Sequence, residues 1–248
     1  MKHSAISSKE PHYRGSFFVR SKDDVMNMFS QVAEQYDTLN HMFSLWGDLR
    51  WRKASARLLN FSEDDHVLDF GCGTGDFTFA LRKHSALYIT AIDLSPEMLD
   101  LMKKKTDNDT SNWLELMATD GEDLPFDENT FDGAVAGFVG RNLLDLHQGL
   151  SEIHRVVKPD GRIGFLEFCK PDNGLMRVVS WLYFRLVVAP FGNLFMGKSV
   201  PAYRYLIDTI EAFYSTGEMR SFLSGAGFRH VYTVYFNFGT VALTVGTK

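Results

Sequence analysis

The sequence predicts an α/β fold built on a seven-stranded, mostly parallel sheet. Between residues 65 and 168, short apolar runs alternate with helical stretches, a pattern typical of parallel strands joined by helices. A turn containing Gly71, Gly73 and Gly75 follows the first apolar run, and Asp93 ends the second. Ligands of such sheets bind outside the carboxyl ends of the strands, so this pairing indicates a nucleotide-type pocket.

The N-terminal region of the chain is expected to be an arm followed by helices. Residues 1–20 are polar and mixed, lack the pattern of a secretory signal, and are expected to form a flexible arm. Residues 21–62 are expected to be helical, with a break close to Tyr36, Asp37 and Asn40.

Five strands are expected near residues 66–70, 87–92, 113–118, 132–138 and 161–168. Ser95 is expected to cap the helix after the second strand, with Pro96 at its first position. The run 103–105 of three lysines is expected to end that helix, where its dipole favours cations. The segment 158–161, Lys-Pro-Asp-Gly, predicts a turn that closes a helix and opens the fifth strand.

The alternation stops after residue 168. Residues 172–212 are expected to form a helical cap inserted between the fifth and sixth strands, suited to covering a substrate. Ser215 to Glu218 has the spacing of a capping box and is expected to start the last helix, which ends near residues 225–227. Two final strands, near 229–236 and 239–246, are expected to form an antiparallel pair at one sheet edge. Residues 21–248 therefore form one predicted domain.

The composition excludes several classes of function. The 248 residues carry 26 basic and 31 acidic side chains, a net charge of −5, and no basic tract, so no nucleic-acid partner is expected. The two cysteines, Cys72 and Cys169, have neither a disulfide framework nor the spacing of a metal site. No metal is therefore expected, and a reducing cytoplasm is the expected location.

Contact with a membrane surface stays open. The richest apolar stretch, residues 178–189, is interrupted by Arg185 and followed by Pro190, so we expect no membrane span. It could form a hydrophobic entrance to the site that contacts a membrane surface or a hydrophobic substrate, or it could be a buried cap helix. The sequence does not set the oligomeric state, and a homodimer is one open arrangement.

The glycine turn favours S-adenosylmethionine as the cofactor. In the dinucleotide fingerprint two residues separate the second and third glycines, whereas one residue separates Gly73 from Gly75, which argues against NAD. Asp76 would place a carboxylate at the first helical turn, where it suits a cationic ligand group. Asp93 can accept both ribose hydroxyls. The alternative is a tight strand-to-helix turn with an unrelated surface aspartate.

Further candidate residues follow the later strands. Asp120 could accept a hydrogen bond from an adenine amino group, and Gly121 would let its backbone approach the ring. An ordinary turn aspartate is an equal interpretation of Asp120. The segment from Gly137 to Asn142 follows the fourth strand, and Glu167 lies at the end of the fifth.

With these residues identified, nearly the whole chain resembles the ubiquinone and menaquinone biosynthesis methyltransferases, which are class I, Rossmann-like enzymes that use S-adenosylmethionine. The resemblance rests on segments 32–40, 69–76, 124–126, 141–142, 157–159 and 167–171. It maps cofactor contacts onto Thr74, Asp93, Asp120 and Gly121, and we add Asp69, Gly71, Gly73, Gly75, Leu94 and Gly137, which lie in or beside the same turns. One departure is Gly137-Phe138-Val139-Gly140, where the family commonly has Ser-Phe-Gly-Leu, so a hydroxyl contact at 137 is missing.

The resemblance implies methylation of a ring carbon of a polyprenylated quinol, most simply of demethylmenaquinol. Such a carbon becomes nucleophilic when a neighbouring hydroxyl ionises, and a guanidinium lowers the phenol pKa from its ordinary value near 10. Arg141 is the candidate, and because its own pKa is above about 12 it is a poor proton acceptor. Tyr36, Asp37 and Asn142 are candidates for orienting the ring and a water that accepts the proton.

Three alternatives remain open from the sequence. Arg141 and Asn142 could form a strand-end turn that pairs with surface carboxylates. The chain could be a methyltransferase of the same fold for another hydrophobic small molecule, which the altered segment 137–140 favours. It could also be a non-catalytic scaffold of a quinone-synthesis complex that keeps the cofactor pocket.

Overall fold

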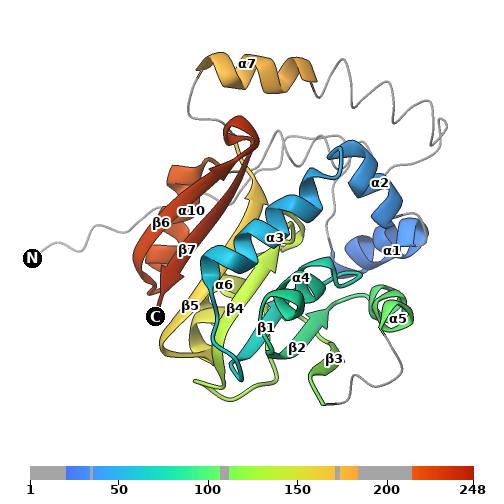
Figure 1. Cartoon of the computed structure of the whole chain (residues 1–248), viewed down its shortest axis with the longest axis vertical. Helices are drawn as coiled ribbons and strands as arrows, with labels where there is room; N and C mark the ends of the chain where they lie inside the picture. The colour runs from blue at the N-terminus through green and yellow to red at the C-terminus, as the bar shows by residue number, and fades with distance from the viewer. Residues whose placement is uncertain (1–20, 34–35, 107–111, 171–173, 184–213) are drawn as a thin grey trace, which may run out of the picture.

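The computed structural model describes residues 21–33, 36–106, 112–170, 174–183 and 214–248. The expected arm at 1–20 and most of the expected cap, residues 184–213, lie outside the described residues. Helices precede and flank a central sheet (Figure 1). The helices are α1 (Lys22–Val32), α2 (Tyr36–Phe43), α3 (Gly47–Leu59), α4 (Asp76–His84), α5 (Pro96–Lys105), α6 (Leu146–Val156), α7 (Gly174–Tyr183) and α10 (Thr216–Gly225), with short 3-10 turns η2 (Gly140–Asn142) and η5 (Asn237–Gly239).

The sheet has seven strands in the order β3-β2-β1-β4-β5-β7-β6. The strands are β1 (His66–Phe70), β2 (Tyr88–Asp93), β3 (Leu114–Ala118), β4 (Phe131–Gly137), β5 (Val157–Phe168), β6 (Arg229–Phe236) and β7 (Val241–Thr247). Strands β1 to β5 are parallel, and β7 is antiparallel to both β5 and β6. The predicted α/β class and the antiparallel pair at one edge are confirmed. Strand β2 lies on one side of β1 and β4 on the other, so the connections that follow β1 and β4 diverge. This divergence opens a crevice at the carboxyl end of β1.

Strands β1, β2, β4 and β7 are buried on both faces, which explains their nearly continuous apolar runs, whereas the edge strand β6 is largely exposed. Neighbouring residues in a strand point to opposite faces. Val67 accordingly packs in the cluster that contains Leu59 of α3 and Leu81 of α4. Leu68 packs in the other cluster, with Ile153 of α6 and Leu223 of α10. Two helical layers therefore hold the carboxyl ends of β1 to β4 in fixed positions.

The predicted helix starts are confirmed at α5 and α10. The Ser95 hydroxyl accepts a hydrogen bond from the Met98 N–H at 3.3 Å, and Pro96 is the first helical residue. Ser215 and Glu218 form the reciprocal capping box that starts α10. The helix break expected near Tyr36 lies between α1 and α2, since Tyr36 is the first residue of α2.

The predicted turn at 158–161 is corrected by the structure, which includes these residues in β5. The ladder pairs Phe131 with Val157 and next pairs Gly133 with Arg162, so the segment bulges from the sheet without ending the strand. Asp160 has a positive φ of 65°, and its N–H donates to the Lys248 carbonyl at 3.2 Å. The turn-forming residues therefore make a bulge that the C-terminus holds in place.

Candidate cofactor and active site

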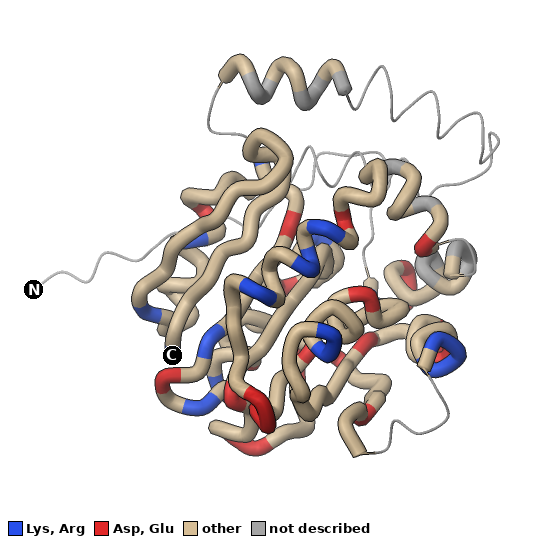
Figure 2. The backbone as a smooth tube through the Cα atoms, viewed as in Figure 1, with Lys and Arg blue, Asp and Glu red and all other residues tan. Residues whose placement is uncertain are grey.

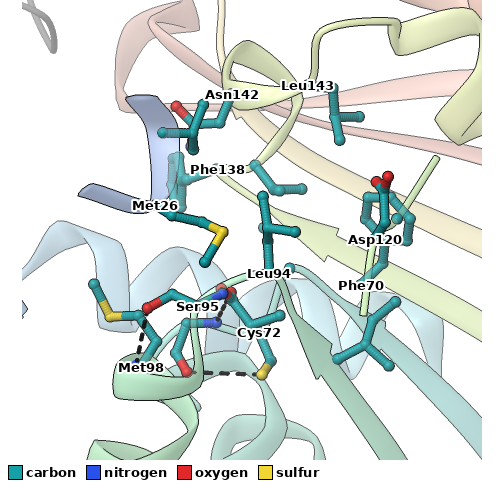
Figure 3. Close-up of a pocket in the computed structure, with 18 of the residues that line it drawn as sticks. Met26, Phe70, Cys72, Leu94, Ser95, Met98, Asp120, Phe138, Asn142 and Leu143 are labelled. Carbon is teal, nitrogen blue, oxygen red and sulfur yellow. Dashed lines mark hydrogen bonds between the residues drawn. The ribbon is translucent and has the colours of Figure 1, made fainter. Parts of the chain in front are cut away.

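A cavity of about 960 Å³, its open mouth included, lies at the carboxyl ends of β1 to β4. Figure 3 shows Asp120 and Phe70 on one side of it, Phe138 and Asn142 on the other, and Leu94 and Ser95 between them. Ten predicted site residues line it: Tyr36, Gly71, Gly73, Thr74, Asp93, Leu94, Asp120, Gly121, Gly137 and Asn142. Four predicted residues do not, namely Asp37, Asp69, Gly75 and Arg141.

The glycine turn has the backbone conformation that the sequence predicts. Gly71, Gly73 and Gly75 have positive φ values of 68°, 55° and 91°. A Cβ on Gly71 would collide with Val139, and one on Gly75 would lie 2.7 Å from Met102, so these two glycines are needed for packing. A Cβ on Gly73 would meet only Tyr36, at 3.9 Å. Gly73 is therefore the position where the missing side chain leaves room for a ligand.

Asp93 is fixed at the mouth of the crevice between β1 and β2. Its Oδ2 accepts the Gly73 N–H at 2.8 Å, and its Oδ1 accepts the Ser95 N–H at 2.9 Å. Burial raises the pKa of Asp93, and the backbone hydrogen bonds oppose that effect. These bonds hold the carboxylate in place at the cavity wall.

Helix α1 closes the end of the cavity near Asp120. Lys22 forms ion pairs with Asp120 and, at 3.0 Å, with Glu122. The glycine at 121 is required because a Cβ there would collide with the ring of Phe70. Sequence reasoning missed Lys22, although the capping box of Ser21 and Asp24 marks the start of its helix.

Asp37 and Lys105 join α2 and α5 to the glycine turn. The Thr74 hydroxyl donates to Asp37, which also forms an ion pair with Lys105. Lys105 lies 3.5 Å from Asp76 as well. The lysine run ends α5 as expected, but Lys105 also neutralises carboxylates beside the turn. Asp37 thus acts on the cavity through Thr74, and Asp76, which lines the cavity, already faces a protein cation.

Asp69 lies beneath the glycine turn and not in the cavity wall. Only 1% of the residue is exposed, and its Oδ2 accepts the Thr78 hydroxyl at 2.5 Å. Burial raises the pKa of Asp69 to about 6, against the hydrogen bond from Thr78 and the charge of Arg52, which lower it. The side chain of Asp69 is turned into the protein, so it does not face the cavity in which we expected it to contact the cofactor.

Replacing Asp69 by asparagine is expected to change how stability depends on pH. The folded-state pKa of about 6 lies above the ordinary value of 3.8, so the folded protein binds this proton more tightly than the unfolded chain does. The free energy of unfolding therefore falls by about 3 kcal/mol as the pH rises from about 4 to about 6, and Asp69→Asn removes that fall. Urea unfolding of both proteins at several pH values checks this. An equal pH dependence in the two proteins would contradict the assignment.

Arg141 forms a buried ion pair with Glu167 at the end of β5. Its Nη1 donates to Glu167 Oε1 and to the Phe138 carbonyl, both at 2.8 Å. The two side chains are 6% and 4% exposed. Burial raises the pKa of Glu167, and the Arg141 charge opposes this. The alternative in which Arg141 pairs with surface carboxylates is wrong, since its carboxylate partner Glu167 is buried.

The charge of Arg141 nevertheless reaches the cavity. Burial raises the pKa of Tyr36, and the charges of Arg141 and Arg52 lower it. Tyr36 lines the cavity, and so does Asn142, whose neighbour Arg141 lies behind the wall. Two of the four predicted catalytic residues thus face the cavity directly, and a third acts on it through its charge.

Sequence reasoning also missed Arg52, a buried cation of α3 that lines the cavity. Its Nη1 donates to Asp48 at 2.9 Å, four residues earlier in the helix. An acid and a base at this spacing are common on exposed helix faces. One feature of the sequence could have identified Arg52 as buried. It lies on the same face of α3 as Ser55, Ala56 and Leu59, which are apolar or small and fully buried.

Comparisons with known proteins give a consistent result. A model described as the ubiE/COQ5 methyltransferase family matches residues 18–248. A demethylmenaquinone methyltransferase of Lactiplantibacillus plantarum is 38% identical over 91% of this chain and 96% of its own length. The ubiquinone/menaquinone biosynthesis C-methyltransferase UbiE of Geotalea uraniireducens is 32% identical over 91% of this chain and 97% of its own length.

A solved structure supports the fold alone. The SAM-dependent methyltransferase of Aquifex aeolicus superposes with a TM-score of 0.56 at 22% identity, over 79% of this chain and 88% of the other. At that identity the likeness shows a shared architecture, and the chemistry has to be argued from the site.

Proposed function

Because it matches that family over residues 18–248, this chain belongs to the ubiE/COQ5 methyltransferase family, and we propose that it methylates a ring carbon of demethylmenaquinol. It is a methyltransferase that uses S-adenosylmethionine, in quinone biosynthesis. The observation that carries the proposal is the single cavity wall that joins Gly73 and Asp93 to Tyr36 and Asn142. This shared wall supports a cofactor subsite beside the predicted substrate-orienting residues.

The residues of the cavity fit S-adenosylmethionine. Space beside Gly73 is open, Asp93 presents a fixed acceptor for ribose hydroxyls, and Gly121, whose missing Cβ makes room for the Phe70 ring, lies in the cavity wall beside Asp120. When bound here, S-adenosylmethionine supplies an electrophilic methyl group on its sulfonium. Leu94 and Asp120 would flank the adenosine.

The protein's own contribution is to ionise and orient the quinol. The positive charges that lower the pKa of Tyr36 would also lower the pKa of a quinol hydroxyl held beside it. Exclusion of water makes these charges interact more strongly with the hydroxyl, while burial itself raises the pKa of a phenol there, as it does for Tyr36. Asn142 offers an amide that can orient the ring or a water that accepts the proton. Holding the reacting groups in place can then supply much of the rate acceleration.

The segment at Gly137 bears on the choice of ring. A Cβ on Gly137 would lie 2.8 Å from Cδ1 of Phe77, so the Phe77 ring occupies the space that a side chain at 137 would need. Phe77 is a buried core residue outside the cavity wall, so the glycine at 137 is needed for packing, and the cavity has no side-chain hydroxyl at that position. Assays on demethylated naphthoquinol and benzoquinol with equal tails test the choice. We expect faster methylation of the naphthoquinol at carbon, whereas methylation at oxygen, or of the benzoquinol alone, would overturn the proposal.

We also propose that this protein is cytoplasmic and touches a membrane surface to reach its polyprenylated substrate. Within the described residues, no helix has the length and apolar character needed to cross a bilayer. Support for surface contact comes from exposed apolar side chains near the cavity end of the molecule, in α7, in the turn before α3 and in η5 (Figure 1). They are Leu175, Val178, Val179, Leu182, Leu45, Trp46 and Phe238. The hairpin of β6 and β7 carries no Lys, Arg, Asp or Glu over residues 231–247, and its tip is uncharged in Figure 2.

Phe238 provides a test of this contact. It is 84% exposed and has a positive φ of 56°, an uncommon combination for a bulky residue. Phe238→Ser together with Trp46→Ser is expected to lower binding to phosphatidylglycerol vesicles about tenfold or more, because two large side chains leave the interface. Sedimentation with vesicles measures this, with Tyr232→Ser, an exposed residue of the edge strand β6, as the control. Unchanged vesicle binding of the double variant would contradict the contact.

A further inference from the structure

Arg52 is a cation in the cavity wall whose charge lowers the pKa of Tyr36 and whose hydrogen-bond donors have no part in the proposed chemistry. It comes from α3, is 7% exposed, and places its guanidinium carbon 4.8 Å above the centroid of the Phe138 ring. The guanidinium is therefore within cation–π distance of the ring, and its Nη1 donates a hydrogen bond to Asp48. The charge of Arg52 acts on both Tyr36 and Asp69, which places it at the β1 end of the cavity.

The order of the strands sets the direction in which the cofactor lies. Asp120 follows β3, Asp93 ends β2, the glycine turn follows β1, and Phe138 follows β4. Figure 3 shows Asp120 and Phe138 on opposite sides of the cavity. A ligand with its adenine beside Asp120 and its ribose at Asp93 therefore extends its other end over the glycine turn, toward Phe138 and Arg52.

Arg52 has hydrogen-bond donors to spare for that end of the ligand. Among the described residues, Lys22 and Arg52 are the basic residues that line the cavity. Lys22 lies at the opposite end and is already paired with Asp120 and Glu122. Arg52 donates to Asp48 through Nη1 alone within the described segments of the chain. Its other N–H groups have the fork geometry that suits a carboxylate.

From this placement we propose that Arg52 binds the α-carboxylate of the methionine tail of S-adenosylmethionine. The proposal rests on the proposed function and extends it to the tail of the cofactor. The guanidinium supplies charge and hydrogen-bond donors, and its contacts with the Phe138 ring and with Asp48 hold it in the cavity wall. Asp76 and Asp93 provide negative charge nearby for the ammonium and sulfonium groups.

Decarboxylated S-adenosylmethionine provides the test, because it keeps the sulfonium and the amine but lacks the carboxylate. Calorimetry with the full-length protein measures the dissociation constant of each compound. The wild-type protein is expected to bind S-adenosylmethionine about 10- to 100-fold more tightly than the decarboxylated compound, as expected for hydrogen bonds to a charged group. Arg52→Met is expected to remove that preference, and Arg52→Lys to keep a fraction of it.

The measured quantity is the ratio of the affinities for S-adenosylmethionine and for the decarboxylated compound, and this ratio does not depend on how much of the protein is folded. Arg52→Met leaves Asp48 with Ser44 and His41 as partners, and any unfolded fraction lowers both affinities equally. Lys22→Met is the matched control, a removed cation at the other end of the cavity, and is expected to leave the ratio unchanged. An Arg52→Met protein that keeps the wild-type ratio would overturn the role of Arg52. Failure of the wild-type protein to bind S-adenosylmethionine would instead refute the proposed function.

Discussion

Replacing Arg141 by methionine is expected to abolish methyl transfer and to lower the free energy of unfolding by about 3–5 kcal/mol. The stability loss follows because Glu167 would stay buried, at 4% exposure of its side chain, without its cationic partner. The activity loss follows because the positive charge that favours an ionised hydroxyl near Tyr36 is removed. Since Arg141 does not line the cavity, the affinity for S-adenosylmethionine is expected to remain within a few fold of wild type. Urea unfolding, a turnover assay and calorimetry measure the three quantities.

A double variant separates the two effects of Arg141. Arg141→Met with Glu167→Gln removes both charges, so no uncompensated charge is buried, and much of the lost stability is expected to return. Turnover is expected to stay absent, because the cation is still missing. A double variant that recovers both stability and turnover would show that Arg141 serves only to hold the fold.

Replacing Asp93 by alanine is expected to weaken binding of S-adenosylmethionine by about 100-fold or more. The carboxylate is the proposed acceptor for two ribose hydroxyls, and each hydrogen bond to a charged group contributes about 1.5–3 kcal/mol. The substitution also takes the acceptor from the N–H groups of Gly73 and Ser95, which loosens the turn that shapes the cavity. Calorimetric titration measures the loss.

Asp100→Ala is the matched control for Asp93→Ala. Asp100 is an exposed aspartate of α5, the helix that follows Asp93, and lies outside the cavity wall. Its removal changes the net charge equally and is expected to leave the affinity unchanged. A folded Asp93→Ala protein with wild-type affinity would show that the ribose binds elsewhere.

Local chemistry explains why the cofactor side of the site could be predicted from the sequence. The positive φ values of Gly71, Gly73 and Gly75 could be predicted from the residue type, since glycine adopts such values without strain. Asp93 and Asp120 follow directly from the strand ends, because all parallel strands present their carboxyl ends at one edge. The capped starts of α5 and α10 were predictable for the same reason, as each depends on a few adjacent residues.

Contacts between distant segments explain what the sequence did not predict. Lys22 meets Asp120 across 98 positions, and Arg141 meets Glu167 across 26, so their partners depend on the tertiary fold. Asp69 belongs to the glycine-turn motif, yet whether its carboxylate faces the ligand or Thr78 depends on the packing of α4. The segment 158–161 has the composition of a turn and became a bulge because the C-terminus pairs with it.

Transfer of a labelled methyl group from S-adenosylmethionine to a reduced, short-chain demethylmenaquinone tests the central claim most directly. The account predicts label on the ring carbon of the quinol with the wild-type protein and no label with Arg141→Met, although both proteins bind the cofactor. Cofactor binding by the wild-type protein without any label in the quinol would contradict it. The cavity would then serve another hydrophobic substrate or a scaffold without chemistry.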